Sequence, residues 1–133
     1  MLYLKNPRRL LNHSLAVPLV LTLIIPLLIF DLWAEIYHRI CFPLYGFPCL
    51  KRGNYIKIDR YKLKYLNFWQ KGFCVYCGYA NGLANYWVKM AAETERYWCG
   101  IKHEENGIFI PPAHHKNFAE YNNEADFIKK YKQ

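Results

Sequence analysis

The feature that most constrains this chain is an apolar run near its N-terminus. Among the sixteen residues from Leu15 to Phe30, Thr22 alone is not aliphatic, aromatic or proline. The run extends to residues 10–33 if four polar residues are admitted, namely Asn12, His13, Ser14 and Asp31. An α-helix needs about 20 residues to cross the hydrocarbon of a bilayer. We therefore predict a transmembrane or membrane-embedded helix over residues 10–33.

Two prolines, Pro18 and Pro26, lie inside this run. Each removes a backbone donor and crowds the preceding turn, so we predict a kinked helix and not a broken one. In lipid, a hydroxyl such as that of Thr22 can help to re-satisfy a freed carbonyl. A buried helix of a soluble protein is a poor alternative, because a chain of 133 residues could hardly surround it.

Basic residues on both sides of the run bear on processing and orientation. Residues 1–9 form a basic flank that also resembles the start of a signal peptide, but residues 31–35 lack a small-residue cleavage site, which favours an uncleaved anchor. The two flanks carry equal numbers of Lys and Arg within about twenty residues. A longer window favours a cytoplasmic C-terminal part, because it adds Lys57, Arg60, Lys62, Lys64 and Lys71. A re-entrant hairpin bent at the prolines is the alternative.

Aromatic and basic residues follow the run. We interpret residues 34–53 as an aromatic interfacial segment at headgroup level, with Pro43, Gly46 and Pro48 limiting any helix there. From Lys51 to Lys71, seven basic residues are interleaved with aromatic ones. In a chain of net charge +8, such a stretch suits either nucleic acid or anionic headgroups. Its place beside a membrane segment favours lipid, so nucleic acid is not the expected partner.

Residues 54–133 are predicted to form a small, basic Cys/His-containing domain, which makes the chain a membrane-anchored α+β protein. Alternating side chains predict short strands at Asn54–Asp59 and Gly107–Ile110. Apolar residues at helical spacing predict one main amphipathic helix from Leu83 to Trp98. A last short helix is expected over Asn123–Tyr131, and loops join these elements.

The cysteines and one histidine form a candidate metal site. Cys74 and Cys77 are a C-x2-C pair, and Cys99 and His103 lie four apart, which gives a Cys3His set typical of zinc. The helix expected between the two halves makes closure of this set barely feasible. Cys49 could replace His103, and four thiolates would also admit iron. We expect one Zn²⁺, with iron as the second choice and simple packing of the thiols as the alternative.

No catalytic set is visible in the sequence. A C-x2-C before a helix is also the layout of thiol–disulfide oxidoreductases, but the strand–helix alternation of such domains is missing upstream. His114 and His115 follow two prolines in a predicted loop, where adjacent histidines are more often exposed than bound to metal. No small-molecule substrate is indicated, and an enzyme is the less favoured class.

Three segments resemble those of a group of small bacterial membrane proteins whose function is uncharacterised. They are Gly46-Phe47-Pro48-Cys49, the CxxC-GYANG stretch from Cys74 to Gly82, and the YWCxIKH stretch from Tyr97 to His103. The resemblance covers residues 40 to 105. It implies a bacterial inner-membrane setting and brings no activity, cofactor or catalytic residue with it.

Together these observations predict a non-enzymatic, membrane-anchored accessory protein that contacts headgroups or a larger membrane complex, with zinc as a structural staple. A staple would matter because a domain of about 80 residues has a thin core. The alternative is a membrane-tethered redox module that uses Cys74, Cys77 and Cys99 through iron or a disulfide. A thiol oxidoreductase on the opposite side of the membrane is a third possibility, although five cysteines do not suit a full disulfide framework.

Overall fold

A computed structural model of the chain describes residues 8–132. Residues 1–7 of the predicted basic flank lie outside this range. Helices hold 67% of the chain, and no strand forms among the described residues, so the predicted α+β class is wrong. Extended backbone pairs at a single parallel bridge, between Ile101 and Ala119.

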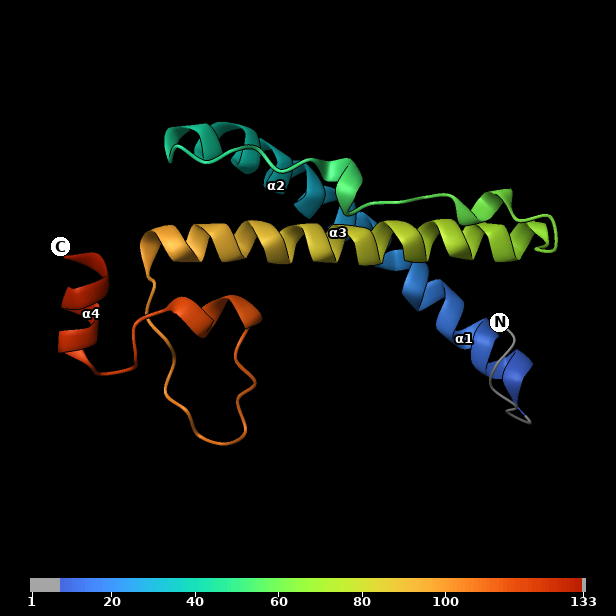
Figure 1. Cartoon of the computed structure of the whole chain (residues 1–133). Helices are drawn as coiled ribbons and strands as arrows, with labels where there is room; N and C mark the ends of the chain where they lie inside the picture. Colours follow the sequence, from blue (N-terminus) through green and yellow to red (C-terminus); the bar gives the residue numbers. More distant parts are fainter. Residues whose placement is uncertain (1–7, 133) are drawn as a thin grey trace. The chain divides into compact units, whose positions relative to one another are not determined.

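The helical elements follow one another along the chain, with the longest connection between α3 and η3 (Figure 1). In chain order they are α1 (Arg9–Thr22), α2 (Ile24–Leu44), η1 (Arg52–Asn54), η2 (Arg60–Lys62), α3 (Phe68–Trp98), η3 (Ala113–Asn117) and α4 (Glu124–Tyr131). The chain forms two compact units, Met1–Trp87 and Val88–Gln133, whose boundary lies within α3. The main helix is thus shared by both units.

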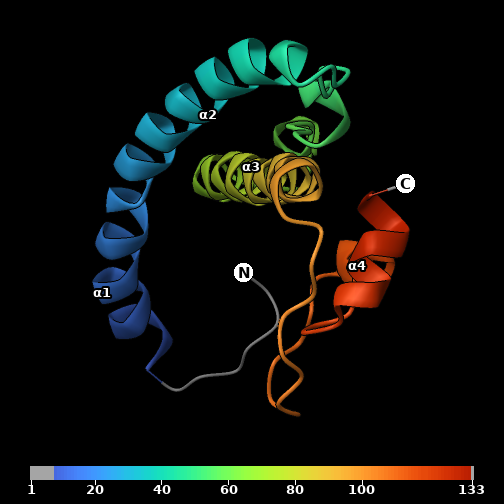
Figure 2. The same ribbon diagram turned by 90° about the vertical axis from the view of Figure 1, so that its left-hand side faces the viewer.

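Helices α1 and α2 form an apolar rod with one interruption at Leu23. The amide of Leu23 donates to the carbonyl of Val20 at 3.3 Å, and the α-helical pattern resumes when Leu27 N–H donates to Leu23 at 3.2 Å. Pro26 has no N–H to offer to the preceding turn, which accounts for the irregularity. The hydroxyl of Thr22 donates to the Leu19 carbonyl at 2.7 Å. The predicted kinked helix is confirmed, and Figure 2 shows the two helices as one curved arc.

The rod is long and apolar enough to cross a membrane. It covers Leu11–Leu44, 34 residues, and its most apolar 18-residue window has a mean hydropathy of 2.5 with 0% of that window buried. Helix α2 continues past residue 33 to Leu44 and includes Pro43, so the prolines and glycine of residues 34–53 end the helix later than expected. The apolar helix therefore extends about eleven residues beyond the predicted end at residue 33.

The segment predicted as the first strand lies on α3 instead. A Cβ at Gly82 would lie 2.7 Å from the Tyr55 carbonyl oxygen and 2.8 Å from Ile56 Cα, and one at Gly78 would lie 3.1 Å from the Lys57 oxygen. Two glycines one helical turn apart therefore form a notch that receives the backbone of residues 55–57. The strand prediction is wrong here because a helix groove, not a second strand, covers this segment.

Helix α3 is longer than predicted. It contains all of the expected Leu83–Trp98 helix but begins at Phe68, so the C-x2-C motif is helical. Gly100, at a φ of +67°, follows its C-terminal end, and Gly100 N–H donates to the Glu95 carbonyl at 3.2 Å. A left-handed glycine there is a common helix terminator.

The other predicted elements of the C-terminal unit have mixed outcomes. Residues 107–110 form an exposed loop, with Ile108 and Ile110 each 88% exposed, so the second strand prediction is wrong because no strand lies beside it. The last helix is confirmed as α4. Asn123 is its N-cap, and its side-chain oxygen accepts from Asp126 N–H at 3.0 Å.

Candidate functional site

Two clusters of polar side chains stand out among the described residues, one in each unit. The first, here called the Asp31–Arg52 network, joins α2, the segment after it and α3. The Arg52 guanidinium donates to both carboxylate oxygens of Asp31, and the Tyr79 hydroxyl donates to the same carboxylate at 2.7 Å. Glu35 lies 3.6 Å from Arg52, and it also pairs with Arg39 at 2.8 Å. Two carboxylates thus face two guanidinium groups, and the charges balance.

The hydrogen bonds of this network define the tautomer of His38 and the direction in which each hydroxyl donates. The amide of Leu50 donates to His38 Nε2 at 2.8 Å, so a neutral His38 carries its proton on Nδ1. That nitrogen lies 3.0 Å from the Tyr86 hydroxyl, which in turn donates to Glu35 at 3.2 Å. Because His38 and Tyr86 are almost completely buried, each polar atom here needs such a partner. The network fastens the polypeptide after α2 to both helices.

The network shifts the pKa of the groups that α3 and the connecting segment contribute. Burial, with the hydrogen bond to Asp31, raises the pKa of Tyr79 to about 12. Burial and the negative charge of Glu35 raise the pKa of Tyr86 to about 12. The hydrogen bond to Asp31 raises the pKa of the Arg52 guanidinium above its usual value. These shifts keep both phenols neutral and Arg52 charged. The network therefore has a structural role.

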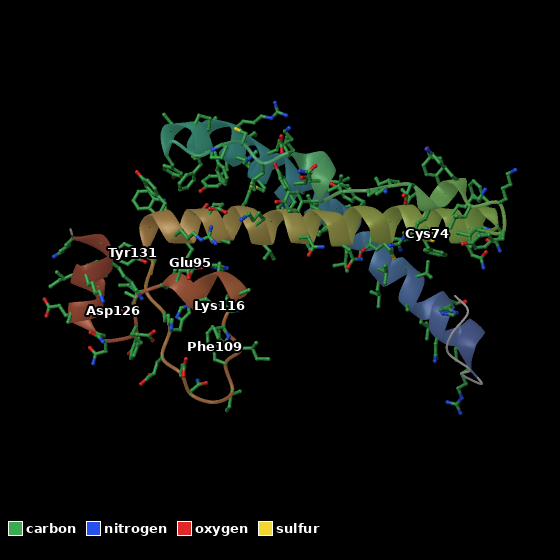
Figure 3. All side chains as sticks on the ribbon, viewed as in Figure 1. Cys74, Glu95, Phe109, Lys116, Asp126 and Tyr131 are labelled. Carbon is green, nitrogen blue, oxygen red and sulfur yellow. The ribbon has the colours of Figure 1, made fainter. Side chains whose placement is uncertain are left out.

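The second cluster lies in the C-terminal unit and centres on Glu95, in the last turns of α3. The ring of His114 lies with Nε2 2.6 Å from one carboxylate oxygen, and His115 Nε2 lies 3.0 Å from the other. Burial raises the pKa of Glu95, but the hydrogen bonds and charges of His114 and His115 outweigh it and leave the pKa below its usual value. Both histidines belong to η3, which packs on the end of α3 (Figure 3).

His103 completes this cluster. Its ring centre lies 5.5 Å from that of His115 and 5.3 Å from that of Phe109. Glu95, His103 and His115 each offer a ligand atom, and these atoms lie within 4.8 Å of one another. His103 and His115 also line a cavity of about 230 Å³, together with Lys102, Glu105, Phe109 and Lys116.

The cysteines of the predicted Cys3His set are not gathered. Cys74 and Cys77 lie one turn apart in the first half of α3 and line a hollow of about 180 Å³ with Arg60 and Gln70, whereas Cys99 follows the end of that helix. An uninterrupted helix rises about 1.5 Å per residue, so the stretch between Cys77 and Cys99 spans about 33 Å. Cys49 lies on the connecting segment, and all five thiols are free. His103 alone among the predicted ligands lies in a cluster that could hold metal.

Sequence reasoning missed Glu95 as a candidate ligand. It lies on the polar side of a helix, where a carboxylate normally faces water, and His103 was grouped with cysteines on the basis of spacing. A usable signal was present in the adjacent His114 and His115 after two prolines, because the prolines restrict how that loop can turn.

Comparison with models of protein families, with curated proteins and with solved structures finds no match to this chain. The resemblance of its three short segments to bacterial membrane proteins therefore stays a prediction.

Proposed function

We propose that this chain is a non-enzymatic accessory protein, anchored in the bacterial inner membrane by α1 and the first part of α2. The observation that carries the proposal is the 34-residue apolar helix whose most apolar window has no buried share. In water, a row of exposed leucines such as Leu15, Leu19 and Leu23 would be costly, whereas lipid accepts them. The positive charge after the helix favours a cytoplasmic C-terminal part.

The segment after the anchor supports contact with anionic headgroups. The exposed residues Lys57, Arg60, Lys62 and Lys64 lie close in sequence to four exposed aromatic side chains, Tyr61, Tyr65, Phe68 and Trp69. Each cation near an anionic surface contributes about 1 kcal/mol, and aromatic rings favour the headgroup layer. A larger membrane complex is the other surface that such a segment could meet.

The redox alternative receives no such support. It needs Cys74, Cys77 and Cys99 to share an iron or to exchange electrons through a disulfide, and the long helix holds the first two apart from the third. It stays a prediction.

The test is membrane extraction of the full chain. In cells that express the protein, the wild type should stay in the membrane pellet after alkaline carbonate washing. Leu19→Arg combined with Leu23→Arg should move it to the soluble or aggregated fraction, because each arginine costs about 2.5–3.5 kcal/mol at the centre of a membrane helix. Ile108→Arg combined with Ile110→Arg, at two exposed loop positions, is the matched control and should remain in the pellet. Release of the wild type by carbonate would contradict the anchor.

A further inference from the structure

We propose that Glu95, His103 and His115 form a binding site for a divalent transition-metal ion, with Zn²⁺ as the expected ion. The site lies wholly in the C-terminal unit and uses no cysteine. It is independent of the membrane anchor, so its failure would leave the proposed function untouched.

The ligand geometry is the first argument. One ligand atom from each of the three residues lies within 4.8 Å of the others without any movement of the backbone. Zinc bonds to imidazole nitrogen and carboxylate oxygen are about 2.0–2.2 Å long, so an ion placed among the three needs only small side-chain shifts. The residues come from α3, the loop after it and η3, so a bound ion would link three parts of the C-terminal unit.

The second argument is an unsatisfied nitrogen. His115 is 2% exposed, and its Nδ1 atom is buried without a hydrogen-bond partner among the described residues. Leaving such an atom unpaired costs about 1–3 kcal/mol. Its other nitrogen, Nε2, lies 3.0 Å from a carboxylate oxygen of Glu95. A metal ion would give the unpaired nitrogen the partner that the protein does not supply.

Hydrogen bonding within the Glu95 cluster explains only part of the arrangement of its side chains. Glu95 is satisfied by His114 and His115, yet these contacts give no reason for the His103 ring to lie beside His115. Two protonated imidazoles this close would repel each other, whereas two neutral ones can share one cation. His114 would then hold the second oxygen of Glu95 and orient the carboxylate, as outer-shell partners of metal ligands do.

The surroundings leave room for a fourth ligand. Three protein ligands leave one tetrahedral position open, and two of the three line the cavity of about 230 Å³. A water molecule or the carboxylate of Glu105, which lines the same cavity, can occupy that position. Lys102, another lining residue, is paired with Glu120 at 2.5 Å, so its charge is compensated outside the cluster.

The experiment measures zinc binding by the full chain in detergent. The protein is stripped with chelator, loaded with zinc alone and dialysed, and bound zinc is determined by elemental analysis and by competition with a chromophoric chelator. We expect about one zinc per chain. Because loss of outer-shell partners alone costs about 10–100-fold in affinity, His103→Ala and Glu95→Gln should each weaken binding by at least about tenfold.

A cysteine-free control separates this site from the Cys3His set. Cys74→Ser, Cys77→Ser and Cys99→Ser in one chain should bind zinc as the wild type does. Substitution with Co²⁺ gives a second readout, because a thiolate ligand produces an intense near-ultraviolet charge-transfer band and a His2Glu site does not. His115 is buried and its replacement could unfold the unit, but His103 is exposed, so His103→Ala keeps the test valid.

Three results would overturn the proposal. They are the absence of stoichiometric zinc in the wild type, full binding by the folded His103→Ala variant, and loss of binding in the triple cysteine variant with a thiolate band in the cobalt form. The last of these would assign the metal to the cysteines instead.

Discussion

At the scale of single residues, Tyr79 and Tyr86 differ from the other tyrosines that the structure describes in detail. Their hydroxyls donate to Asp31 and Glu35, and Tyr86 is fully buried. A phenolate could make neither of these hydrogen bonds and would face a carboxylate at close range. The folded protein therefore favours the neutral phenols, and this preference is coupled to stability.

The sign of that coupling follows from the two pKa values. Each is raised from about 10 to about 12, so the stabilisation is complete below pH 10 and is lost as the pH rises from 10 to 12. In a spectrophotometric titration of the detergent-solubilised chain, Tyr79 and Tyr86 should give a late phase. Tyr79→Phe and Tyr86→Phe should each remove part of this late phase and reduce the loss of stability between pH 10 and 12.

Tyr65 provides the control for this titration, because it is 77% exposed. Tyr65→Phe should leave the late phase unchanged. If all tyrosines ionise together in the folded protein, the Asp31–Arg52 network does not hold these phenols as described.

At the scale of secondary-structure elements, the notch on α3 decides how residues 55–57 are held. Gly78 and Gly82 have no side chain to keep the backbone of this segment away, so it approaches α3 closely. Glycine inside a helix costs about 1 kcal/mol relative to alanine, and this cost is offset here by the contact. Gly72, in the same helix, has nothing within 4 Å of an added Cβ and makes no such contact.

Alanine substitutions at these three glycines should therefore differ in sign. Gly72→Ala should stabilise the protein by up to about 1 kcal/mol through helix propensity alone. Gly82→Ala should destabilise it, because overpacking against fixed backbone costs about 1–3 kcal/mol and exceeds the gain. Gly78→Ala, with one contact at 3.1 Å, should lie between them. Denaturation midpoints in detergent measure the series, and equal midpoints for Gly72→Ala and Gly82→Ala would rule out the notch.

The same elements show what could be predicted from the sequence. The apolar N-terminal helix, the main helix and α4 rest on apolar runs and helical spacing, which are local signals, and all three form as helices. The strand predicted at Asn54–Asp59 is wrong, because alternating apolar and polar side chains indicate that one face of a segment is buried but not which element buries it. The start of α3 was also missed, because two glycines and a C-x2-C motif are typical of a turn.

The candidate metal site depended on that missed start. Cys74 and Cys77 could approach Cys99 only if the helix began late, and its beginning at Phe68 separates them. Glu95 and His115 come together through the fold of the loop after α3, which no local spacing encodes. Hydrophobic periodicity and secondary-structure propensity do not predict the path of an irregular loop.

At the scale of the whole molecule, charge is arranged around the apolar helix. The polar residues near its C-terminal end balance within the Asp31–Arg52 network, so that end carries little net charge of its own. The excess of positive charge lies in the preceding flank and in the segment that follows the network. Positive charge on either side of a membrane helix favours the cytoplasmic face. A single span places the N-terminus on the face opposite the C-terminal part, whereas a re-entrant hairpin keeps both on the same face.

Thiol labelling of intact cells separates these two topologies. One chain keeps Cys99, which is exposed, and has the other four cysteines replaced by serine; a second chain has all five replaced and carries Leu2→Cys instead. With a membrane-impermeant maleimide, Cys99 should react only after the inner membrane is permeabilised, since the basic segment favours a cytoplasmic C-terminal part. For a single span, the Leu2→Cys chain should react before permeabilisation, because the rod of 34 residues then crosses the bilayer once. Protection of both positions would indicate a hairpin bent near Leu23, and labelling of Cys99 in intact cells would place the C-terminal part outside and contradict the proposed orientation.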